Sequence, residues 1–297
     1  MMGAEGAMIT ITPSGAALGA RLDGVDLNRL DDAMFATIEG ALHRHGVIVL
    51  SDQHIDERVF LDFSKRFGPL EINITSRFQH PAHPEILVLS NRMRDGQPVG
   101  LADAGQGWHT DNSYNRIPGR ASILYALEVP VREGVVLGDT LFADMRAAWR
   151  TLPEPVKAKL ADRTAEHDFA KFYDDMIKSK GSTRPPLTDA QRRARPPVPH
   201  PLALRHPYTG ETCLYADPGY TTRIIGMDPA ESDALLASLF EHETQPALIY
   251  RHKWRRYDML IWDNCATIHM ATGGYRADEP RHMMRTQISV DPARMPA

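Results

Sequence analysis

Short apolar segments of β-type composition recur along almost the whole chain, and they constrain the fold more than any other feature. Turn residues separate these segments, as expected for strands rather than long helices. They are residues 47–53, 86–90, 121–129, 139–145, 248–254, 258–264 and 283–290. Many short strands with few helices predict a mainly β chain, with a β-barrel or sandwich core and flanking helices.

Helical spacing of apolar residues occurs in fewer places. The predicted helices cover residues 30–46, 56–67, 144–161 and 229–243. The first ends at Gly46, a residue suited to closing a helix in the left-handed conformation. The last begins at Asp228-Pro229, which fits an N-cap followed by proline in the first helical position.

Composition disfavours several classes of protein. The chain has 297 residues, 42% hydrophobic and 24% charged, so it can bury a stable core without disulfides. A formal net charge of −4 gives no electrostatic reason to expect nucleic acid or an anionic membrane as a partner. No segment reaches the roughly 18 apolar residues that cross a bilayer, and we see no secretion signal. With only Cys213 and Cys265 as cysteines, we expect reduced thiols and a cytoplasmic protein.

The motif Trp-His-Thr-Asp at residues 108–111 is the strongest candidate for metal binding. In a strand or at a strand end, residues two apart point to the same side, so His109 and Asp111 would aim at one point. His269, which follows a strongly apolar strand and a short turn, is the best third ligand. Two histidines and one carboxylate with open positions suit non-haem Fe(II). 2-Oxoglutarate would fill two of those positions, and dioxygen the third.

Two arginines, Arg281 and Arg285, follow the third candidate ligand. If the last strand extends back over RHMMRTQIS, the two would share one face of it, about 13 Å apart. Two guanidinium groups facing a barrel interior are costly unless each meets an anion. Arginine also suits bidentate recognition of carboxylates. The pair therefore predicts two bound anions, 2-oxoglutarate and an acidic substrate, whereas two solvent-exposed arginines are the alternative.

Other interpretations of these residues stay open. A zinc hydrolase could use the same three ligands, and so could a non-catalytic jelly-roll that binds a small molecule. Cys265 lacks an activating base nearby in the sequence, so we expect a buried structural thiol. The glycine-rich residues 91–107 lack the strand and helix of a phosphate-binding loop, and we expect a gating loop there.

An ordered set of motifs over nearly the whole chain resembles the family of taurine dioxygenase and 2,4-dichlorophenoxyacetate dioxygenase. The motifs are LGARLDGVDLNRL (18–30), HGVIVLSDQ, FSKRFGPL, WHTD, GDTLFADMRAAW, LRHPYTGETCLY, GYTTRII and WDNCATIH with two later arginines. The resemblance implies a double-stranded β-helix, or jelly-roll, with flanking helices. It also implies an Fe(II)- and 2-oxoglutarate-dependent dioxygenase that uses O2 and releases succinate and CO2.

The resemblance assigns roles to individual residues. His109, Asp111 and His269 match the iron ligands of the family. Arg281 matches the arginine that pairs with the distal carboxylate of 2-oxoglutarate, and Thr140 matches its hydroxyl partner. Arg285 matches the arginine that receives the anionic group of the substrate. The residues that fall where the substrate pocket is expected are Asn73, Phe169 and Tyr220.

Departures from the family pattern bear on the substrate. The approach to Thr140, VREGVVLGDT, is a few residues longer than in the family. Asn73 stands where taurine dioxygenase has a histidine near the sulfonate, which argues against taurine. FADMRAAW and YRHKW look closer to the aryloxyacetate enzyme. We therefore expect a small organic anion, with an aryloxyalkanoate-like carboxylate favoured over a sulfonate.

The polar, proline-rich residues 177–201 could be mistaken for a linker between domains. The candidate ligands lie on both sides of this stretch and must meet in one site. We therefore expect residues 1–297 to form a single dioxygenase domain in which 177–201 is a lid or an insertion. We also expect the chain to form a homo-oligomer.

Overall fold

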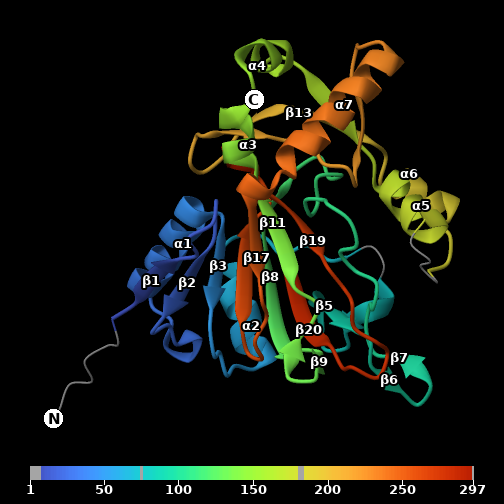
Figure 1. Cartoon of the computed structure of the whole chain (residues 1–297). Coiled ribbons are helices and arrows are strands. Elements are labelled where there is room, and N and C mark those ends of the chain that lie inside the picture. The colour runs from blue at the N-terminus through green and yellow to red at the C-terminus, as the bar shows by residue number, and fades with distance from the viewer. Residues whose placement is uncertain (1–7, 74–75, 180–183, 296–297) are drawn as a thin grey trace.

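The computed structural model describes residues 8–73, 76–179 and 184–295, and its framework is two β-sheets (Figure 1). The larger sheet has eight strands, all in antiparallel pairs except β2 with β3. In spatial order they are β1 (Thr10–Pro13), β2 (Ala20–Asp23), β3 (Val47–Leu50), β18 (Met259–Asp263), β8 (Gly119–Glu128), β20 (His282–Ser289), β5 (His83–Ser90) and β4 (Gln79–His80). The smaller sheet, β17 (Ile249–His252), β11 (Thr140–Asp144) and β19 (Thr267–Ala271), lies across the larger one.

Side-chain alternation in the larger sheet creates two separate cores. On its outer face, Ile48 and Leu50 of β3 pack in one cluster with helices α1 (Asp32–His45) and α2 (Glu57–Lys65). On its inner face, Val47 and Val49 pack in another cluster that contains Phe142 of β11. Because both faces are covered, these strands are apolar throughout, which is the pattern seen in the sequence.

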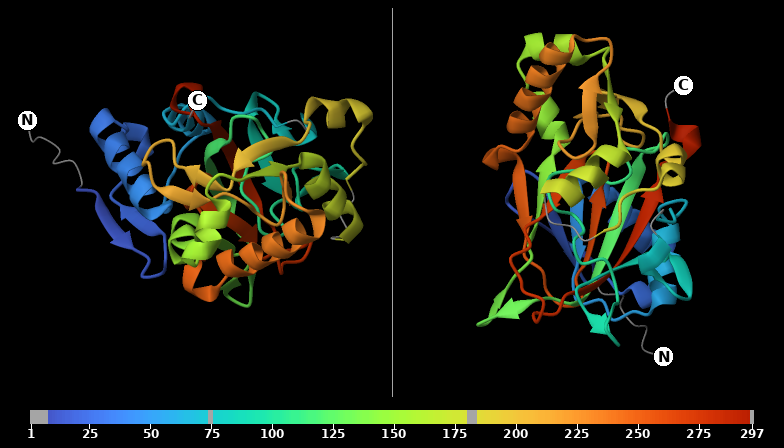
Figure 2. Two further views of the ribbon diagram at one scale, coloured as in Figure 1. Left: turned by 90° about the horizontal axis from the view of Figure 1, so that it is seen from above. Right: turned by 90° about the vertical axis from the view of Figure 1, so that its right-hand side faces the viewer.

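A second group of elements sits at the ends of the two sheets (Figures 1 and 2). Its helices are α3 (Met145–Thr151), α4 (Glu154–Leu160), α5 (Phe169–Ser179), α6 (Asp189–Ala194) and α7 (Pro229–Glu243). Its strands are β12 (Thr164–His167), β13 (Val198–Pro201), β14 (Ala203–Arg205), β15 (Thr212–Leu214) and β16 (Thr221–Ile224). The third core cluster joins α3 and α7 to these strands through residues such as Ala148, Leu239 and Leu214.

Short elements complete the described part of the chain. Two small hairpins are β6 (Met93–Arg94) with β7 (Gln97–Pro98), and β9 (Val131–Arg132) with β10 (Val135–Val136). The single 3-10 turns are η1 (Leu27–Arg29), η2 (Ser76–Phe78), η3 (Pro246–Leu248) and η4 (Pro292–Arg294). Within the described residues, no helix combines the length and apolar character needed to cross a membrane.

The predicted helix boundaries at Gly46 and Asp228 are confirmed. Gly46 closes α1 with φ of 70°, and its N–H donates to the carbonyl of Leu42 at 2.7 Å. The Asp228 carboxylate caps α7 by accepting from the N–H groups of Ala230 and Glu231. These features form locally, so the sequence alone predicts them.

The prediction of one helix over residues 144–161 is wrong. The structure has two helices, α3 and α4, separated by Leu152 and Pro153. Leu152 is extended, with φ of −61° and ψ of 141°, because a residue before proline avoids the helical region.

The predicted glycine-rich loop at residues 91–107 also contains the β6–β7 hairpin.

Candidate active site

His269 lies on β19, in register with Phe142 of the neighbouring strand β11. Residues that face each other in an antiparallel pair point to the same side, so His269 shares the inner face with Phe142. His109 joins the edge of this sheet by a single bridge to His269, with N–H···O distances of 3.1 and 2.7 Å. The backbone thus places the two imidazole rings side by side, 4.2 Å apart between centroids.

Residues 108–111 do not form a continuous strand, yet His109 and Asp111 meet as expected. Only His109 forms a β-bridge, and the chain turns immediately afterwards, with Asn112 at φ of 63°. Asp111 nevertheless lies beside His109, with Oδ1 3.8 Å from Nε2 of the imidazole. The sequence motif was therefore informative about the ligands but not about the backbone that presents them.

The three predicted metal ligands converge. Nε2 of His109 lies 3.8 Å from Oδ1 of Asp111, and Nε2 of His269 lies 3.9 Å from Oδ2. Their ligand atoms all lie within 4.8 Å of one another, and all three side chains are buried. Nδ1 of His109 donates to the carbonyl of Gly107 at 2.9 Å, so Nε2 keeps its lone pair for a metal.

The protonation states also suit a metal. Burial, followed by the neighbouring His109, holds the pKa of His269 well below its ordinary value, so the imidazole is neutral. Burial alone would raise the pKa of Asp111, but the Arg285 guanidinium and the two histidines outweigh it and hold this pKa below its ordinary value. Two neutral imidazoles and one carboxylate anion are the donor set that non-haem Fe(II) requires.

Both predicted arginines are buried, so the alternative of two solvent-exposed arginines is wrong. Nη1 of Arg285 lies 3.5 Å from Oδ1 of Asp111, and Nη2 lies 3.5 Å from Oε1 of Gln287. These contacts are long and leave room for a closer anionic partner. Burial lowers the pKa of Arg281, Tyr275 partly opposes this, and Nε of Arg281 has no hydrogen-bond partner among the described residues.

Thr140 lies at the start of β11, two residues before Phe142, so its side chain points to the same inner face. Its Oγ1 accepts a hydrogen bond from Nε1 of the buried Trp254 at 3.1 Å. Because that bond uses an acceptor site, the hydroxyl proton of Thr140 remains able to donate to an anion.

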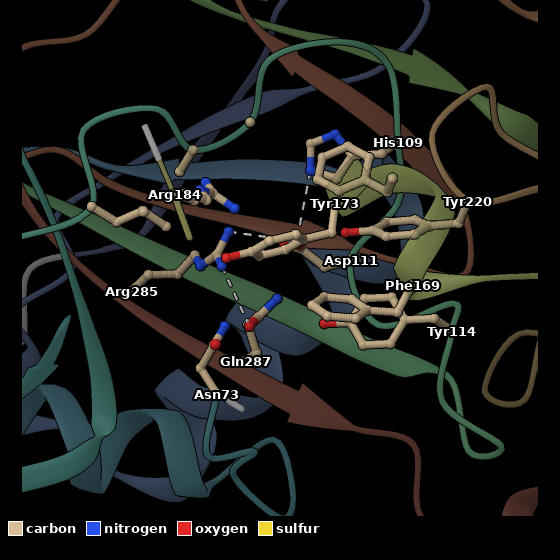
Figure 3. Close-up of a pocket in the computed structure, with 14 residues that line it drawn as sticks. Asn73, His109, Asp111, Tyr114, Phe169, Tyr173, Arg184, Tyr220, Arg285 and Gln287 are labelled. Carbon is tan, nitrogen blue, oxygen red and sulfur yellow. Dashed lines mark hydrogen bonds and ion pairs between the residues drawn. The ribbon is translucent and has the colours of Figure 1, made fainter. Parts of the chain in front are cut away.

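A pocket opens beside the ligands and is lined by all three residues predicted for it, Asn73, Phe169 and Tyr220 (Figure 3). Aromatic rings pack closely in its wall, with centroid distances of 4.6 Å for Phe172–Tyr220 and 4.8 Å for Tyr114–Tyr220. Arg285 reaches the same pocket from β20. The arrangement places a cation and an aromatic wall on either side of the metal ligands.

Comparisons with known proteins agree with this geometry. The family model described as "Taurine catabolism dioxygenase TauD, TfdA family" matches residues 10–287. The chain belongs to the TauD/TfdA family. The expected enzyme class, an Fe(II)- and 2-oxoglutarate-dependent dioxygenase that uses O2, is thereby confirmed. The zinc hydrolase and the non-catalytic jelly-roll are not favoured.

Individual relatives align with this TauD/TfdA enzyme over almost its whole length. Pentalenolactone F synthase of Streptomyces arenae is 32% identical, covering 95% of this chain and 96% of its own. The (S)-phenoxypropionate/alpha-ketoglutarate-dioxygenase of Sphingobium herbicidovorans is 32% identical, with the same coverage of 95% and 96%. A taurine dioxygenase from Burkholderia xenovorans of known structure is 32% identical with a TM-score of 0.77, covering 95% of this chain and 90% of that one.

Several residues that line the pocket of this TauD/TfdA enzyme escaped the sequence prediction. They are Tyr114, Phe172, Tyr173, Arg184 and Gln287, together with loop residues 101, 104 and 105. Spacing could have revealed some of them. Phe172 and Tyr173 stand one helical turn after Phe169, and Gln287 stands two residues after Arg285 on the same strand face. No comparable signal marks Arg184.

Arg184, from the segment predicted as a lid or an insertion, lines this pocket. Arg184 makes a bidentate ion pair with Asp103 of the glycine-rich loop: Nη2 lies 2.7 Å from Oδ1, and Nε lies 3.1 Å from Oδ2. The Tyr173 hydroxyl donates to the carbonyl of Pro185 at 3.0 Å, which ties the same segment to α5. Residues 180–183 of the predicted lid lie outside the described residues.

A second cluster of potential ligands, His206, Asp263 and Cys265, is structural. Nδ1 of His206 accepts from the N–H groups of Tyr208 and Thr209, so Nε2 carries the proton and donates to Asp263 at 2.9 Å. A metal would need the lone pair that this tautomer lacks. Burial raises the pKa of the Cys265 thiol, which fits the structural role predicted for it.

Proposed function

We propose that this TauD/TfdA enzyme hydroxylates a small organic carboxylic acid with an apolar or aryl body. The observation that carries the proposal is the buried Arg285, which lies beside Asp111 and opens into an aromatic pocket. A cation at that place orients an anionic substrate with its apolar part against the rings and a C–H bond near the metal centre.

We assign the iron to His109, Asp111 and His269. Bound Fe(II) supplies the activation of O2, in which one oxygen atom oxidises 2-oxoglutarate to succinate and CO2 and the other hydroxylates the substrate. The donor set fits because the His269 imidazole is held neutral, the Asp111 carboxylate is held ionised, and Nδ1 of His109 donates to the Gly107 carbonyl and leaves Nε2 for the metal. The protein contributes orientation of the reactants and exclusion of water.

We assign Arg281 and Thr140 to 2-oxoglutarate. A buried guanidinium without a carboxylate partner among the described residues is costly, and the distal carboxylate of the co-substrate would neutralise it. The free hydroxyl proton of Thr140 can donate to the same carboxylate. Arg281 directly precedes β20 and Arg285 lies within it, so the first half of this strand can bind both anions.

The preference for a carboxylate rests on the surroundings of Arg285. A guanidinium fits a carboxylate with two parallel hydrogen bonds, although it also accepts a sulfonate. Gln287 and Asn73 line the pocket as neutral polar groups, and the charge of Arg184, which also lines it, is paired with Asp103. The aromatic wall of Phe169, Phe172 and Tyr220 suits an aryl or alicyclic body. One relative is named for phenoxypropionate, whereas the structural relative is named for taurine.

We also propose that the segment around Arg184 acts as a lid. The pocket leaves about 50 Å³ of free space, whereas sites for small ligands occupy roughly 300–1,000 Å³. We therefore propose that the segment around Arg184 moves when substrate enters and that the Arg184–Asp103 pair is the contact that breaks. We further propose that the two facing sheets have a jelly-roll topology and that the chain forms one domain. We also propose that the protein is a homo-oligomer located in the cytoplasm.

The test is a panel of substrates assayed under matched conditions. 2,4-Dichlorophenoxyacetate, 2-phenoxypropionate and an alicyclic acid are compared with taurine and longer alkylsulfonates. We expect acid-dependent succinate with a hydroxylated or cleaved product for at least one carboxylate. Turnover of sulfonates with every carboxylate inert would overturn the preference. If no organic anion couples, the assignment of Arg285 to substrate is wrong.

A further inference from the structure

Asp111 is held by a directional chain of hydrogen bonds from the inner face of the larger sheet. Nδ2 of Asn264 donates to Oγ of Ser122 at 3.0 Å, and Oγ of Ser122 donates to Oδ2 of Asp111 at 2.7 Å. The hydroxyl accepts from the amide, so its own proton points to the carboxylate, which can only accept. We propose that Asn264 and Ser122 are positioning residues that fix the orientation of the Asp111 carboxylate toward the metal.

The backbone of Asn264 ties the same turn to the ligand segment. Oγ1 of Thr110 donates to the carbonyl of Asn264 at 2.7 Å, and Thr110 stands between His109 and Asp111. The N–H of Asn264 donates to the carbonyl of Arg120 at the start of β8. Asn264 therefore connects β8 and the His109–Asp111 segment with the turn that leads to His269.

That turn is itself held rigidly. Oδ1 of Asp263 accepts from the N–H groups of Cys265 and Ala266 at 2.9 and 3.2 Å, while His206 holds the other oxygen. Gly119 allows the close approach of the ligand segment. A Cβ at that position would lie 2.8 Å from the carbonyl oxygen of Asp111 and 3.1 Å from Nδ2 of Asn264.

The hydrogen-bond chain from Asn264 through Ser122 has a competitor, because Arg285 can also bind the Asp111 carboxylate. Nη1 of Arg285 already lies 3.5 Å from Oδ1 of Asp111. Without the Ser122 hydroxyl, the carboxylate can rotate into a closer two-bond pair with the guanidinium. That rotation would weaken the metal site and occupy the arginine that receives the substrate. The inference rests on the proposed function, which takes Asp111 as an iron ligand and Arg285 as the substrate anchor.

The experiment measures Mn(II) binding to the metal-free enzyme, without 2-oxoglutarate, from the electron paramagnetic resonance signal of free Mn(II). Ser122→Ala removes one atom at a fully buried position, and Asn264→Leu removes the donor amide but keeps the backbone bonds. The control is Ser64→Ala, which deletes a buried hydroxyl bonded to Phe60 and Thr286 on the outer side of the sheet. We expect Ser122→Ala to weaken Mn(II) binding about 10- to 100-fold, Asn264→Leu to weaken it less, and Ser64→Ala to leave it unchanged.

The double variant separates a positioning role from a general loss of stability. Because Asn264 acts through Ser122, the double variant should bind Mn(II) no more weakly than Ser122→Ala alone. Ser122→Ala should also raise the KM for the acid, since Asp111 would then engage Arg285. If the two substitutions weaken Mn(II) binding additively in the double variant, or if Ser122→Ala binds Mn(II) as the wild type does, the proposed positioning role is wrong. Wild-type Mn(II) binding by Asp111→Ala would instead overturn the ligand assignment on which it rests.

Discussion

Replacing Arg281 by methionine should have opposite effects on the free protein and on its complex with 2-oxoglutarate. Arg281 is 7% exposed, its pKa is lowered by burial, and no ion pair with a carboxylate is found for it among the described residues. Replacing a buried charge by an apolar side chain of similar length is often neutral or stabilising. We therefore expect the free Arg281→Met protein to unfold at or above the wild-type temperature.

The complex should lose far more than the free protein gains. Breaking a buried charge pair costs about 3–5 kcal/mol, or roughly 150- to 5,000-fold in affinity. At 100 times its Kd, 2-oxoglutarate stabilises the wild type by about 2.7 kcal/mol, but a 150-fold weaker complex gains only about 0.3 kcal/mol. For 297 residues the entropy of unfolding is about 0.6 kcal/mol/K, so the expected wild-type shift is about 4 °C.

The assay is calorimetric unfolding under anaerobic conditions with Mn(II), with and without 2-oxoglutarate. Arg285→Met is the matched control, because it removes the other buried arginine, which lies in β20, and should keep the 2-oxoglutarate response. If 2-oxoglutarate raised the unfolding temperature of Arg281→Met as much as that of the wild type, the reasoning would be refuted. So would a loss of the shift in Arg285→Met alone, which would exchange the roles of the two arginines.

Three further predictions address the metal, the substrate and the pH dependence of stability. Asp111→Ala should abolish substrate-coupled formation of succinate, and unchanged product yield would exclude Asp111 as a ligand. Arg285→Ala should raise the KM for the acid at least 10-fold, in the range of about 1.5–3 kcal/mol for a hydrogen bond to a charged group, with the KM for 2-oxoglutarate little changed. Burial raises the folded-state pKa of Asp217 to about 7 and that of Glu243 well above its ordinary value. The stability that these two protonated carboxyl groups contribute is fully present below about pH 4, where they are protonated in the unfolded chain as well. It is lost as pH rises through their folded-state pKa values, which for Asp217 is about 7. Urea unfolding at pH 6 and 8 should show a smaller loss for Glu243→Gln than for the wild type, and an equal loss would contradict this assignment.

Local sequence determined the elements whose causes are local. The caps at Gly46 and Asp228 and the apolar runs of β3, β5, β8 and β18 follow from neighbouring residues and from strand periodicity. The ligand types were also evident, because two histidines and a carboxylate stand in recognisable motifs. The two arginines were evident as well, but Arg281 lies just before β20 and the register with β8 shifts between His282 and Met283, so counting residues did not establish a shared face.

Tertiary structure alone decided how these parts meet. The single bridge between His109 and His269 brings the two histidines together, and it cannot be deduced from the motif Trp-His-Thr-Asp. The Asn264–Ser122–Asp111 chain joins residues 142 and 11 positions apart. Sequence periodicity reports which face of an element is buried, but not which distant element covers that face. For that reason the metal ligands could be predicted from the sequence, whereas the residues that orient them and close the pocket could not.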